Sequence, residues 1–308
     1  MKNNNSLCNK LHKYKLKMKR ILITGATGNV GIELIKFLFE SNTSSRIIAG
    51  VRNIEKSKKI FSSYDKLEFV NFDFENKNTF DKSLENIDSL FLLRPPHISD
   101  INKYFKPLIQ TIKDKGISEL VFLSVQGAEK SKIIPHHKIE KLIEEFELNH
   151  IFIRPSYFMQ NLTTTLHKDI AEKRKLILPA GKAKFNWIDI ENIGEVAAIV
   201  LENFDNYKNK AYELTGNENL NFYDIAQLIS KITNQKIDYY DTNPFKFYIT
   251  KKKEGIKTGM ILVMILLHFL PRFQPEPKLS NFYKQLTNKQ PTSITKFIEK
   301  EIDKFKKN

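Results

Sequence analysis

Short, wholly apolar runs recur along the first half of the chain, and apolar residues at helical spacing lie between them. A continuous apolar run of this length is typical of a strand that is buried on both faces of a parallel sheet. The predicted strands are 21–23, 46–52, 67–72, 89–93, 119–124 and 151–154. Helices are predicted between them, for example over 32–39 and 101–115. This alternation predicts an α/β fold with a doubly wound parallel sheet.

A glycine-rich turn joins the first predicted strand to the first predicted helix. Glycines stand at Gly25, Gly28 and Gly31, in the spacing GxxGxxG. Bare backbone N–H groups at a helix N-terminus bind phosphate, and glycines let a diphosphate and the helix approach closely. The position between strand and helix favours a dinucleotide-binding turn of the Rossmann type over a purely structural turn. The predicted cofactor contacts in this turn are Gly25, Thr27, Gly28, Asn29, Val30 and Gly31.

The pattern changes after Pro155, where the segments become shorter and more mixed. Strands are expected over 185–190 and 211–215, and helices over 193–201, 222–233 and 293–305. We expect these segments to build a smaller α/β cap beside the carboxyl edge of the sheet, where open α/β sheets bind substrates. The predicted organisation is a flexible basic tail over 1–18, an NAD(P)-binding core over 19–155, and a substrate-side cap with interleaved core elements over 156–308.

Composition narrows the class of protein. The 308 residues carry a formal net charge of +15, but the lysines are scattered along the chain, so nucleic-acid binding is not favoured. The single cysteine, Cys8, excludes an internal disulfide and fits a reducing, cytoplasmic location. Residues 1–17 lack the apolar core of a secretory signal.

One apolar stretch, 255–270, is too short to span a bilayer as a helix. It is expected to be a buried or pocket-lining helix, with an interfacial membrane contact as the alternative.

Three positions at strand ends bear on the cofactor. An acidic residue at the end of the second strand would bind the adenine ribose of NAD, but this chain has Arg52 there. Because arginine pairs well with phosphate, Arg52 predicts NADP(H) over NAD(H), unless it is simply a solvated surface residue. Asp73 and Phe74 follow the third strand, near the expected adenine, although Asp73 can equally cap the next turn. Arg94 opens an Arg-Pro-Pro sequence after the fourth strand, beside the middle of the cofactor.

Together these motifs resemble the NmrA-like group of atypical short-chain dehydrogenases/reductases. The resemblance runs from about Lys19 to the C-terminus. It rests on 23–31, 92–96, 123–128, His136 with Glu140, 154–161, 187–193 and 212–216. It implies a Rossmann fold and NAD(P) binding. Members include NADPH-dependent quinone and azo-dye reductases, and also regulators that sense the cofactor without turnover.

The usual catalytic pair of short-chain dehydrogenases is not where it would be expected. That pair, Tyr-x-x-x-Lys, follows the fifth strand, but no tyrosine lies between Ser124 and Arg154. Tyr248 and Lys252 have the spacing but fall far outside this region. Ser124 matches the position of the usual serine of this group and is therefore predicted to line the nicotinamide site, as a catalytic and cofactor-binding residue. His136 supplies a proton or hydrogen-bonds the nicotinamide ribose, or it is an exposed residue at a helix start. No metal site is expected, because the histidines are scattered and no cysteine cluster exists.

A site without this tyrosine suits an acceptor that takes hydride directly, such as a quinone or azo compound, whose anion is protonated by water. Tyr157, Phe158 and Met159 are predicted to form an apolar wall for such an acceptor, or to belong to the core, and Asn161 is a further predicted substrate residue. The expected function is therefore an NAD(P)H-dependent oxidoreductase of a small-molecule acceptor. The alternative is a non-catalytic NADP(H)-sensing regulator with a protein partner. A DNA-associated regulator, suggested by charge alone, ranks last.

Overall fold

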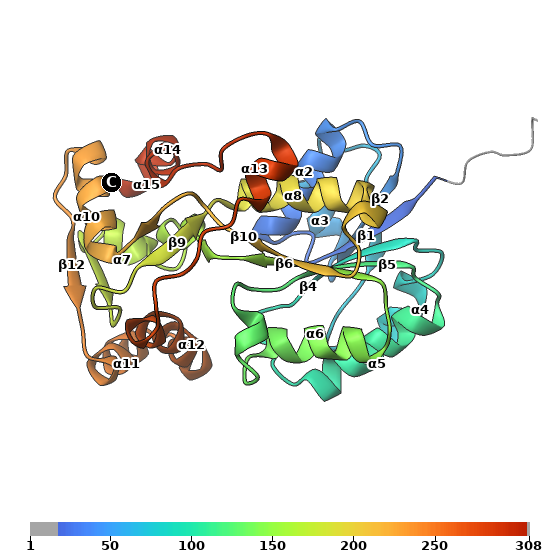
Figure 1. Cartoon of the computed structure of the whole chain (residues 1–308), viewed down its shortest axis with the longest axis horizontal. Helices are drawn as coiled ribbons and strands as arrows, with labels where there is room; N and C mark the ends of the chain where they lie inside the picture. Colours follow the sequence, from blue (N-terminus) through green and yellow to red (C-terminus); the bar gives the residue numbers. More distant parts are fainter. Residues whose placement is uncertain (1–17, 307–308) are drawn as a thin grey trace, which may run out of the picture.

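A seven-stranded parallel sheet forms the centre of the larger domain (Figure 1). The computed structural model describes residues 18–306. The strand order is β10-β6-β5-β4-β1-β2-β3, and every neighbouring pair is parallel. The strands are β1 (Arg20–Thr24), β2 (Arg46–Val51), β3 (Glu68–Asn71), β4 (Ser89–Leu93), β5 (Glu119–Leu123), β6 (His150–Pro155) and β10 (Lys210–Leu214). The order reverses between β1 and β4, so a crevice is expected at their carboxyl ends.

Helices cover both faces of this sheet, and each face has its own apolar core. One core joins the sheet to α2, α3 and α8, and the other joins it to α4, α5 and α6. These helices are α2 (Asn29–Glu40), α3 (Ile54–Ile60), α4 (Phe80–Ser83), α5 (Ile101–Asp114), α6 (Pro135–Glu145) and α8 (Ile190–Glu202). The helices α2 and α8 cross closely, because a Cβ at Gly194 would lie 2.7 Å from Cβ of Glu33. The doubly wound α/β fold predicted from the sequence is confirmed.

The cap has a separate apolar core with Trp187 fully buried in it. Its strands are β7 (Tyr157–Phe158), β8 (Lys175–Leu178), β9 (Phe185–Ile188), β11 (Asn219–Leu220) and β12 (Asp238–Asp241). Its helices are α7 (His167–Ala171), α10 (Phe222–Thr233), α11 (Pro244–Lys253), α12 (Thr258–Phe269), α14 (Ile294–Lys300) and α15 (Ile302–Phe305). Figure 1 shows the cap beside the sheet domain, with α11 and α12 at one corner of the molecule.

Several segments that were expected to build the cap belong to the sheet domain instead. The strand at 210–214 is the edge strand β10, which pairs with β6, and α8 packs on α2. Two short helices, α9 (Phe204–Tyr207) and α13 (Phe282–Thr287), also lie on the sheet domain, since Phe204 and Tyr283 are buried in its core. The expectation that all of these segments build the cap is therefore wrong for β10 and α8. A parallel edge strand needs only hydrogen bonds on one side, so a late segment can join the sheet.

Two predicted boundaries also change. The helix α8 begins at Ile190 and not at 193, because the Asp189 side chain accepts a hydrogen bond from the Glu191 amide and caps it there. The last predicted helix, 293–305, is interrupted at Glu301 and forms α14 and α15. The remaining short 3-10 turns are η1 (Lys77–Thr79), η2 (Ala128–Lys130), η3 (Met159–Leu162) and η4 (Leu270–Phe273).

The apolar stretch 255–270 contains α12, which is buried on one face only. Ile261, Met264 and His268 face the cap core, whereas the other face is exposed. The expectation of a buried or pocket-lining helix thus holds for one face. Among the described residues, no helix is both long enough and apolar enough to cross a membrane. The expected N-terminal tail, including Cys8, lies outside the described residues except for Met18.

Candidate functional site

The glycine turn follows β1 and leads directly into α2. Gly25 has φ +63°, a left-handed conformation that glycine adopts without strain, and the Gly28 N–H donates to the Gly25 carbonyl at 2.9 Å. Gly28 is the N-cap of α2, and the first helical N–H bond is the one from Ile32 to Gly28. The N–H groups of Asn29, Val30 and Gly31 therefore have no partner within the helix. Their position suits a diphosphate group.

The third glycine is needed for close packing of the turn itself. A Cβ at Gly31 would lie 2.4 Å from the Gly25 carbonyl oxygen and 2.7 Å from Cα of Ala26. Even alanine would force the turn apart there. Gly31 therefore allows the start of α2 to approach the turn itself, whereas the sequence-based expectation is a close approach of the helix to the strand.

Thr24 holds the glycine turn against the end of β4. Its Oγ1 donates to the Phe91 carbonyl at 3.0 Å and accepts from the Leu93 N–H at 3.0 Å. The Leu93 side chain lies beneath the turn, 3.1 Å from where a Cβ at Gly25 would be. The buried Thr24 hydroxyl closes the gap between β1 and β4 at the point where the strand order reverses.

Arg94 and His136 come together beyond β4, from different elements. Arg94 Nε donates to His136 Nε2 at 3.4 Å, and Arg94 Nη1 donates to the carbonyls of Pro95 and Pro96 at 3.0 and 3.2 Å. His136 lies in the first turn of α6 and stacks on Phe122 of β5, with ring centroids 6.1 Å apart. The structure thus brings two of the predicted cofactor residues together, and His136 is half-buried and not an exposed residue at a helix start.

His136 is a neutral imidazole at physiological pH. Burial, together with the charge of Arg94, lowers its pKa from 6.5 to about 3. Since Nε2 accepts from Arg94, the proton of the neutral ring is on Nδ1. Of the two roles considered for this histidine, the geometry favours hydrogen-bond donation over proton supply near neutrality.

Ser124 follows β5 and has an unusual hydroxyl. The residue is buried, yet its Oγ has no hydrogen-bond partner among the described residues. Its backbone N–H donates to the Ile153 carbonyl at 2.8 Å, and the Gln126 N–H donates to the Pro155 carbonyl at 2.9 Å, so the segment is fixed to β6. A buried hydroxyl without a partner is costly unless a ligand pairs with it.

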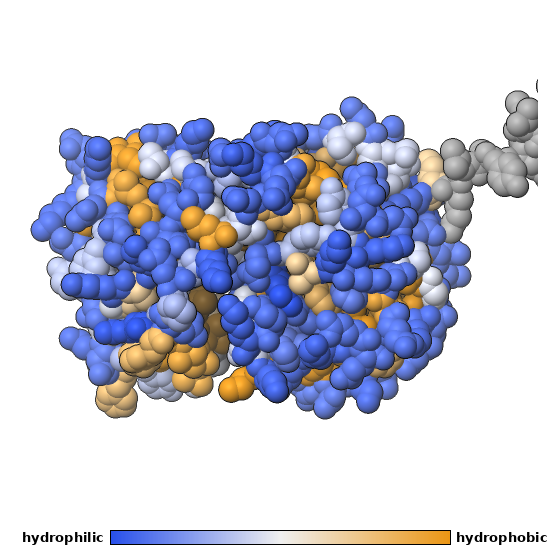
Figure 2. Space-filling view, in the orientation of Figure 1, coloured by the Kyte–Doolittle hydropathy of each residue, from blue (hydrophilic) through white to orange (hydrophobic). Residues whose placement is uncertain are grey.

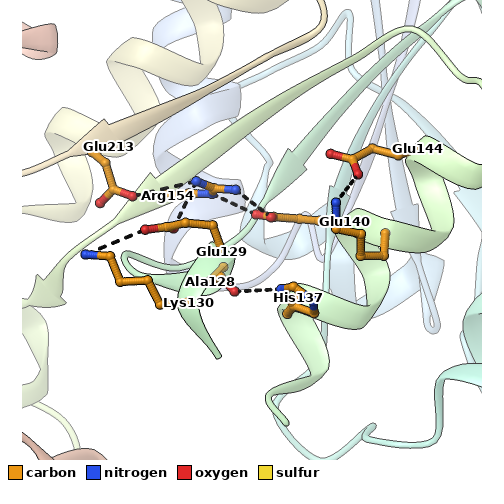
Figure 3. A network of polar contacts seen from close by, with 9 residues as sticks. Ala128, Glu129, Lys130, His137, Glu140, Glu144, Arg154 and Glu213 are labelled. Atoms are coloured by element: carbon orange, nitrogen blue, oxygen red, sulfur yellow. Dashed lines mark hydrogen bonds and ion pairs between the residues drawn. The ribbon is translucent and has the colours of Figure 1, made fainter. Parts of the chain in front are cut away.

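Arg154 lies at the centre of a cluster of charged side chains that includes Glu129, Glu140 and Glu213 (Figure 3). Arg154 of β6 donates to both carboxylate oxygens of Glu140 on α6, at 3.0 and 2.7 Å. It also pairs with Glu129 at 3.0 Å and Glu213 at 3.9 Å. Burial, followed by the charge of Glu129, raises the pKa of Glu213. Glu140 therefore fixes α6 to the sheet, and its role beside His136 is to position the helix.

The residues expected around the adenine lie at the ends of β2 and β3. Arg52 follows β2 and is exposed, and none of the described acidic side chains pairs with it. Asp73 Oδ1 accepts the Glu75 N–H at 3.0 Å, which is the turn-capping alternative. The Phe74 side chain is buried against Phe72 and Phe105, so only its backbone can face a ligand.

The predicted substrate residues follow β6 at the boundary with the cap. Tyr157 donates its hydroxyl hydrogen to His268 Nε2 at 2.9 Å, because His268 Nδ1–H donates to the Met264 carbonyl. Burial raises the pKa of Tyr157. Phe158 is partly buried against the sheet core, and Asn161 is half-buried in η3. Tyr157 packs edge-on against three cap aromatics, namely Phe185, Trp187 and Phe222.

His268 is a site residue that sequence reasoning missed. It is buried and fixes the Tyr157 ring from the inner face of α12. The signal was present in the sequence, since His268 follows Ile261 and Met264 at helical spacing within an apolar helix. Tyr248 and Lys252, whose spacing imitates the catalytic pair, lie on α11 in the cap.

A hollow of about 640 Å³ lies within the cap and away from the glycine turn. Gly181, Lys184, Tyr223, Arg272 and Glu276 contribute to its lining. Among the described residues, no group of three or more His, Cys, Asp and Glu side chains is arranged to hold a metal ion.

Comparison with known proteins identifies the family of this chain. The model of the NmrA-like family matches residues 17–266. The chain belongs to the NmrA-like family. The glycine turn, the Arg94–His136 contact and Ser124 all lie within the matched residues of this NmrA-like protein.

Proteins that are similar to this chain in sequence or structure include the following three. Prestalk A differentiation protein A of Dictyostelium discoideum is 28% identical, covering 91% of this chain and 91% of that protein. The NAD(P)H azoreductase of Xenophilus azovorans is 25% identical, covering 71% of this chain and 76% of that protein. The NADPH-dependent quinone oxidoreductase QOR2 of Escherichia coli, solved with NADPH, superposes with a TM-score of 0.80 at 19% identity, over 92% of this chain and 99% of that one.

Proposed function

We propose that this NmrA-like protein is an NAD(P)H-dependent oxidoreductase that transfers hydride to a small flat acceptor such as a quinone or azo compound. The observation that carries the proposal is the buried Ser124 hydroxyl, which has no hydrogen-bond partner within residues 18–306 and lies at the same sheet edge as the glycine turn and the Arg94–His136 pair. The names of its relatives support the proposal, since they include an NAD(P)H azoreductase and a quinone oxidoreductase.

The residues present fit a nicotinamide dinucleotide. The free N–H groups at the start of α2 bind the diphosphate, and the side-chain-free surface of the glycines leaves room for it. Ser124 Oγ and His136 Nδ1–H are the hydrogen-bonding groups for the nicotinamide end. Bound in this way, the reduced cofactor supplies the hydride.

The protein's own contribution is binding and orientation. His136 is neutral and keeps its proton on Nδ1, so it donates a hydrogen bond without being consumed as an acid. Tyr157 holds its hydroxyl proton in the bond to His268, and Tyr157, Phe158 and Asn161 are the proposed contacts for the acceptor. Water supplies the proton that the reduced acceptor takes up, and no dedicated tyrosine is required.

We further propose NADP(H) as the preferred cofactor. Arg52 is exposed at the end of β2 and pairs with none of the described carboxylates, so its guanidinium is available to a 2′-phosphate. The variant Arg52→Gln is expected to lose affinity for NADPH while keeping its affinity for NADH. Equal losses for both cofactors, measured by calorimetry, would refute this assignment.

The function is tested by following NADPH absorbance with a panel of quinones and azo dyes. The variant Gly28→Asp places a carboxylate side chain at the predicted diphosphate position, with its Cβ 3.1 Å from the Gly25 carbonyl oxygen, and is expected to abolish both binding and turnover. Gly259→Ala is the matched control, because a Cβ there meets no atom within 4 Å. Thermal melting checks that both variants fold.

The alternative function is a non-catalytic NADP(H)-sensing regulator with a protein partner. It is favoured by the developmental, non-enzymatic name of the Dictyostelium relative. It predicts calorimetric cofactor binding without turnover of any acceptor, and a partner complex that differs between NADP and NADPH. Turnover at enzymatic rates would refute it. For either function we propose a cytoplasmic location, in agreement with the single cysteine.

A further inference from the structure

From Met260 onward, the outer face of the helix α12 consists of apolar side chains. Met260, Leu262, Val263, Leu266, Leu267 and Leu270 are each between 44% and 54% exposed. The opposite face, with Ile261, Met264 and His268, is buried in the cap. Figure 2 shows apolar side chains gathered over α11 and α12, beside the hollow between the cap and the sheet domain. We call the six exposed residues the α12 face.

Such a face is unusual for a helix on the surface of a protein. A surface helix normally carries charged or polar residues opposite its buried stripe, and a helix that is apolar all round is normally covered. Neighbouring Phe273 and Phe245 are more than 70% exposed and extend the apolar surface. A contiguous exposed patch of this kind marks an interaction surface.

Lysines surround the N-terminal end of the α12 face. Lys252, Lys253 and Lys257 are exposed, and Lys257 is the N-cap residue of α12. The first turn of α12 has no acidic residue, and none of the described carboxylates pairs with Lys253 or Lys257. Cations at a helix N-terminus oppose the helix dipole, whereas an anion there is stabilised. The end of α12 therefore favours a negatively charged partner.

We propose that the α12 face docks on an anionic phospholipid surface. The leucines and valine insert among the acyl chains at the interface, and the three lysines contact headgroup phosphates. This combination of an apolar helix face with adjacent lysines is the arrangement that binds peripheral proteins to anionic leaflets. A second copy of the chain is disfavoured, because its α12 face offers no acidic residue to pair with these lysines.

The proposal is tested by co-sedimentation of the full chain with phosphatidylcholine vesicles, with and without phosphatidylglycerol. The wild type is expected to bind the anionic vesicles and to be released by salt. The double variant L262Q/L266Q is expected to bind at least about tenfold more weakly, since two apolar side chains no longer insert. The variants K253Q and K257Q are each expected to lose about fivefold in affinity for anionic vesicles.

The matched control is I133Q, which removes an 86%-exposed isoleucine in the segment before α6, on the sheet domain. It is expected to bind like the wild type, and thermal melting verifies that all variants fold. Residues 1–17 are unchanged in every variant, so their basic side chains cannot account for a difference. Unchanged binding of L262Q/L266Q, or equal wild-type binding to neutral vesicles, would overturn the proposal. A wild-type dimer in analytical ultracentrifugation that L262Q/L266Q dissociates would assign the face to a second copy instead. None of these readouts depends on cofactor binding or turnover.

Discussion

Ser124 and Ser89 both have buried hydroxyls without a partner among the described residues. The two residues lie at opposite ends of neighbouring strands. Ser89 begins β4, whereas Ser124 follows the carboxyl end of β5. Removing an unsatisfied buried hydroxyl is neutral or stabilising in the absence of a ligand. If a ligand pairs with the Ser124 hydroxyl, however, removing that hydroxyl weakens the binding of the ligand.

We therefore expect Ser124→Ala to keep or slightly raise the free energy of unfolding, by up to about 1 kcal/mol, and to weaken NADPH binding by about tenfold. Ser89→Ala is expected to have the same effect on stability and none on binding. Chemical denaturation and calorimetry measure the two quantities. Equal NADPH affinity of both variants would contradict a role for Ser124 at the site.

The histidine buried in the cap makes folding sensitive to acid. Burial lowers the pKa of His268 from 6.5 to about 4. Between these values the unfolded chain binds more protons than the folded one, so the contribution to stability is complete above about pH 6.5 and is lost as the pH falls toward 4. His136, with a pKa of about 3, acts in the same direction.

The variant His268→Gln is expected to be less stable at pH 7, because the bond to Tyr157 changes, but to lose less stability between pH 6.5 and 4. The slope of the free energy of unfolding against pH in this range is expected to fall by up to about 1.4 kcal/mol per pH unit. Denaturation at several pH values measures it, and comparison with the wild type cancels the contributions of the carboxylates. His97→Gln, at an exposed histidine, is the control. An unchanged slope would show that His268 is accessible to protons in the folded state.

At the scale of elements, the Arg154 cluster joins α6 to β6 and β10. Arg154 is the only cation in direct contact with Glu140, Glu129 and Glu213 together within the described residues. Removing it leaves three carboxylates near one another, two of them partly or fully desolvated. Removing one of its partners still leaves Arg154 paired. Removing Arg154 should therefore cost more stability than removing any one of its carboxylate partners.

Arg154→Met is expected to lower the free energy of unfolding by about 3 kcal/mol or more, and Glu140→Gln by clearly less. Lys141→Ala breaks the exposed Lys141–Glu144 pair on the same helix and should change stability by less than about 0.5 kcal/mol. Urea denaturation compares the three variants. A smaller effect of Arg154→Met than of Glu140→Gln would show that the carboxylates are protonated and do not repel one another.

At the scale of the whole molecule, the chain passes repeatedly between the two domains. Asn186 of the cap accepts hydrogen bonds from Ser156, just after β6, and from Gly216, just after β10. Gly216 packs so closely on the Trp187 carbonyl that a Cβ would lie 2.0 Å from it. These contacts hold together the segments in which the chain passes between the two domains. The cap and the sheet domain should therefore unfold as one unit.

Trp187, the single tryptophan of the chain, is fully buried in the cap and reports on this coupling. NADPH at about 100 times its dissociation constant should stabilise the fold by about 2.7 kcal/mol. We expect the midpoint from Trp187 fluorescence to rise together with that from far-ultraviolet circular dichroism. A shift in the circular dichroism midpoint alone would mean that the cap unfolds independently.

The sequence by itself predicted the strands of the sheet domain up to β6, their alternation with helices, and the glycine turn. These features depend on local patterns, because strand burial, helix periodicity and the need for bare glycines are all properties of neighbouring residues. The GxxGxxG spacing was enough to place the candidate diphosphate site, and the motif pattern was enough to indicate the family.

Only the tertiary structure decided which late segments complete the sheet and how the polar residues pair. The pairing of β10 with β6, the Arg94–His136 contact and the bond between Tyr157 and His268 each join residues more than 40 positions apart. The neutral state of His136 likewise depends on burial and on Arg94, neither of which its own neighbours in the chain specify. Long-range packing sets these features, because the charge and hydration of a side chain follow from what surrounds it in space.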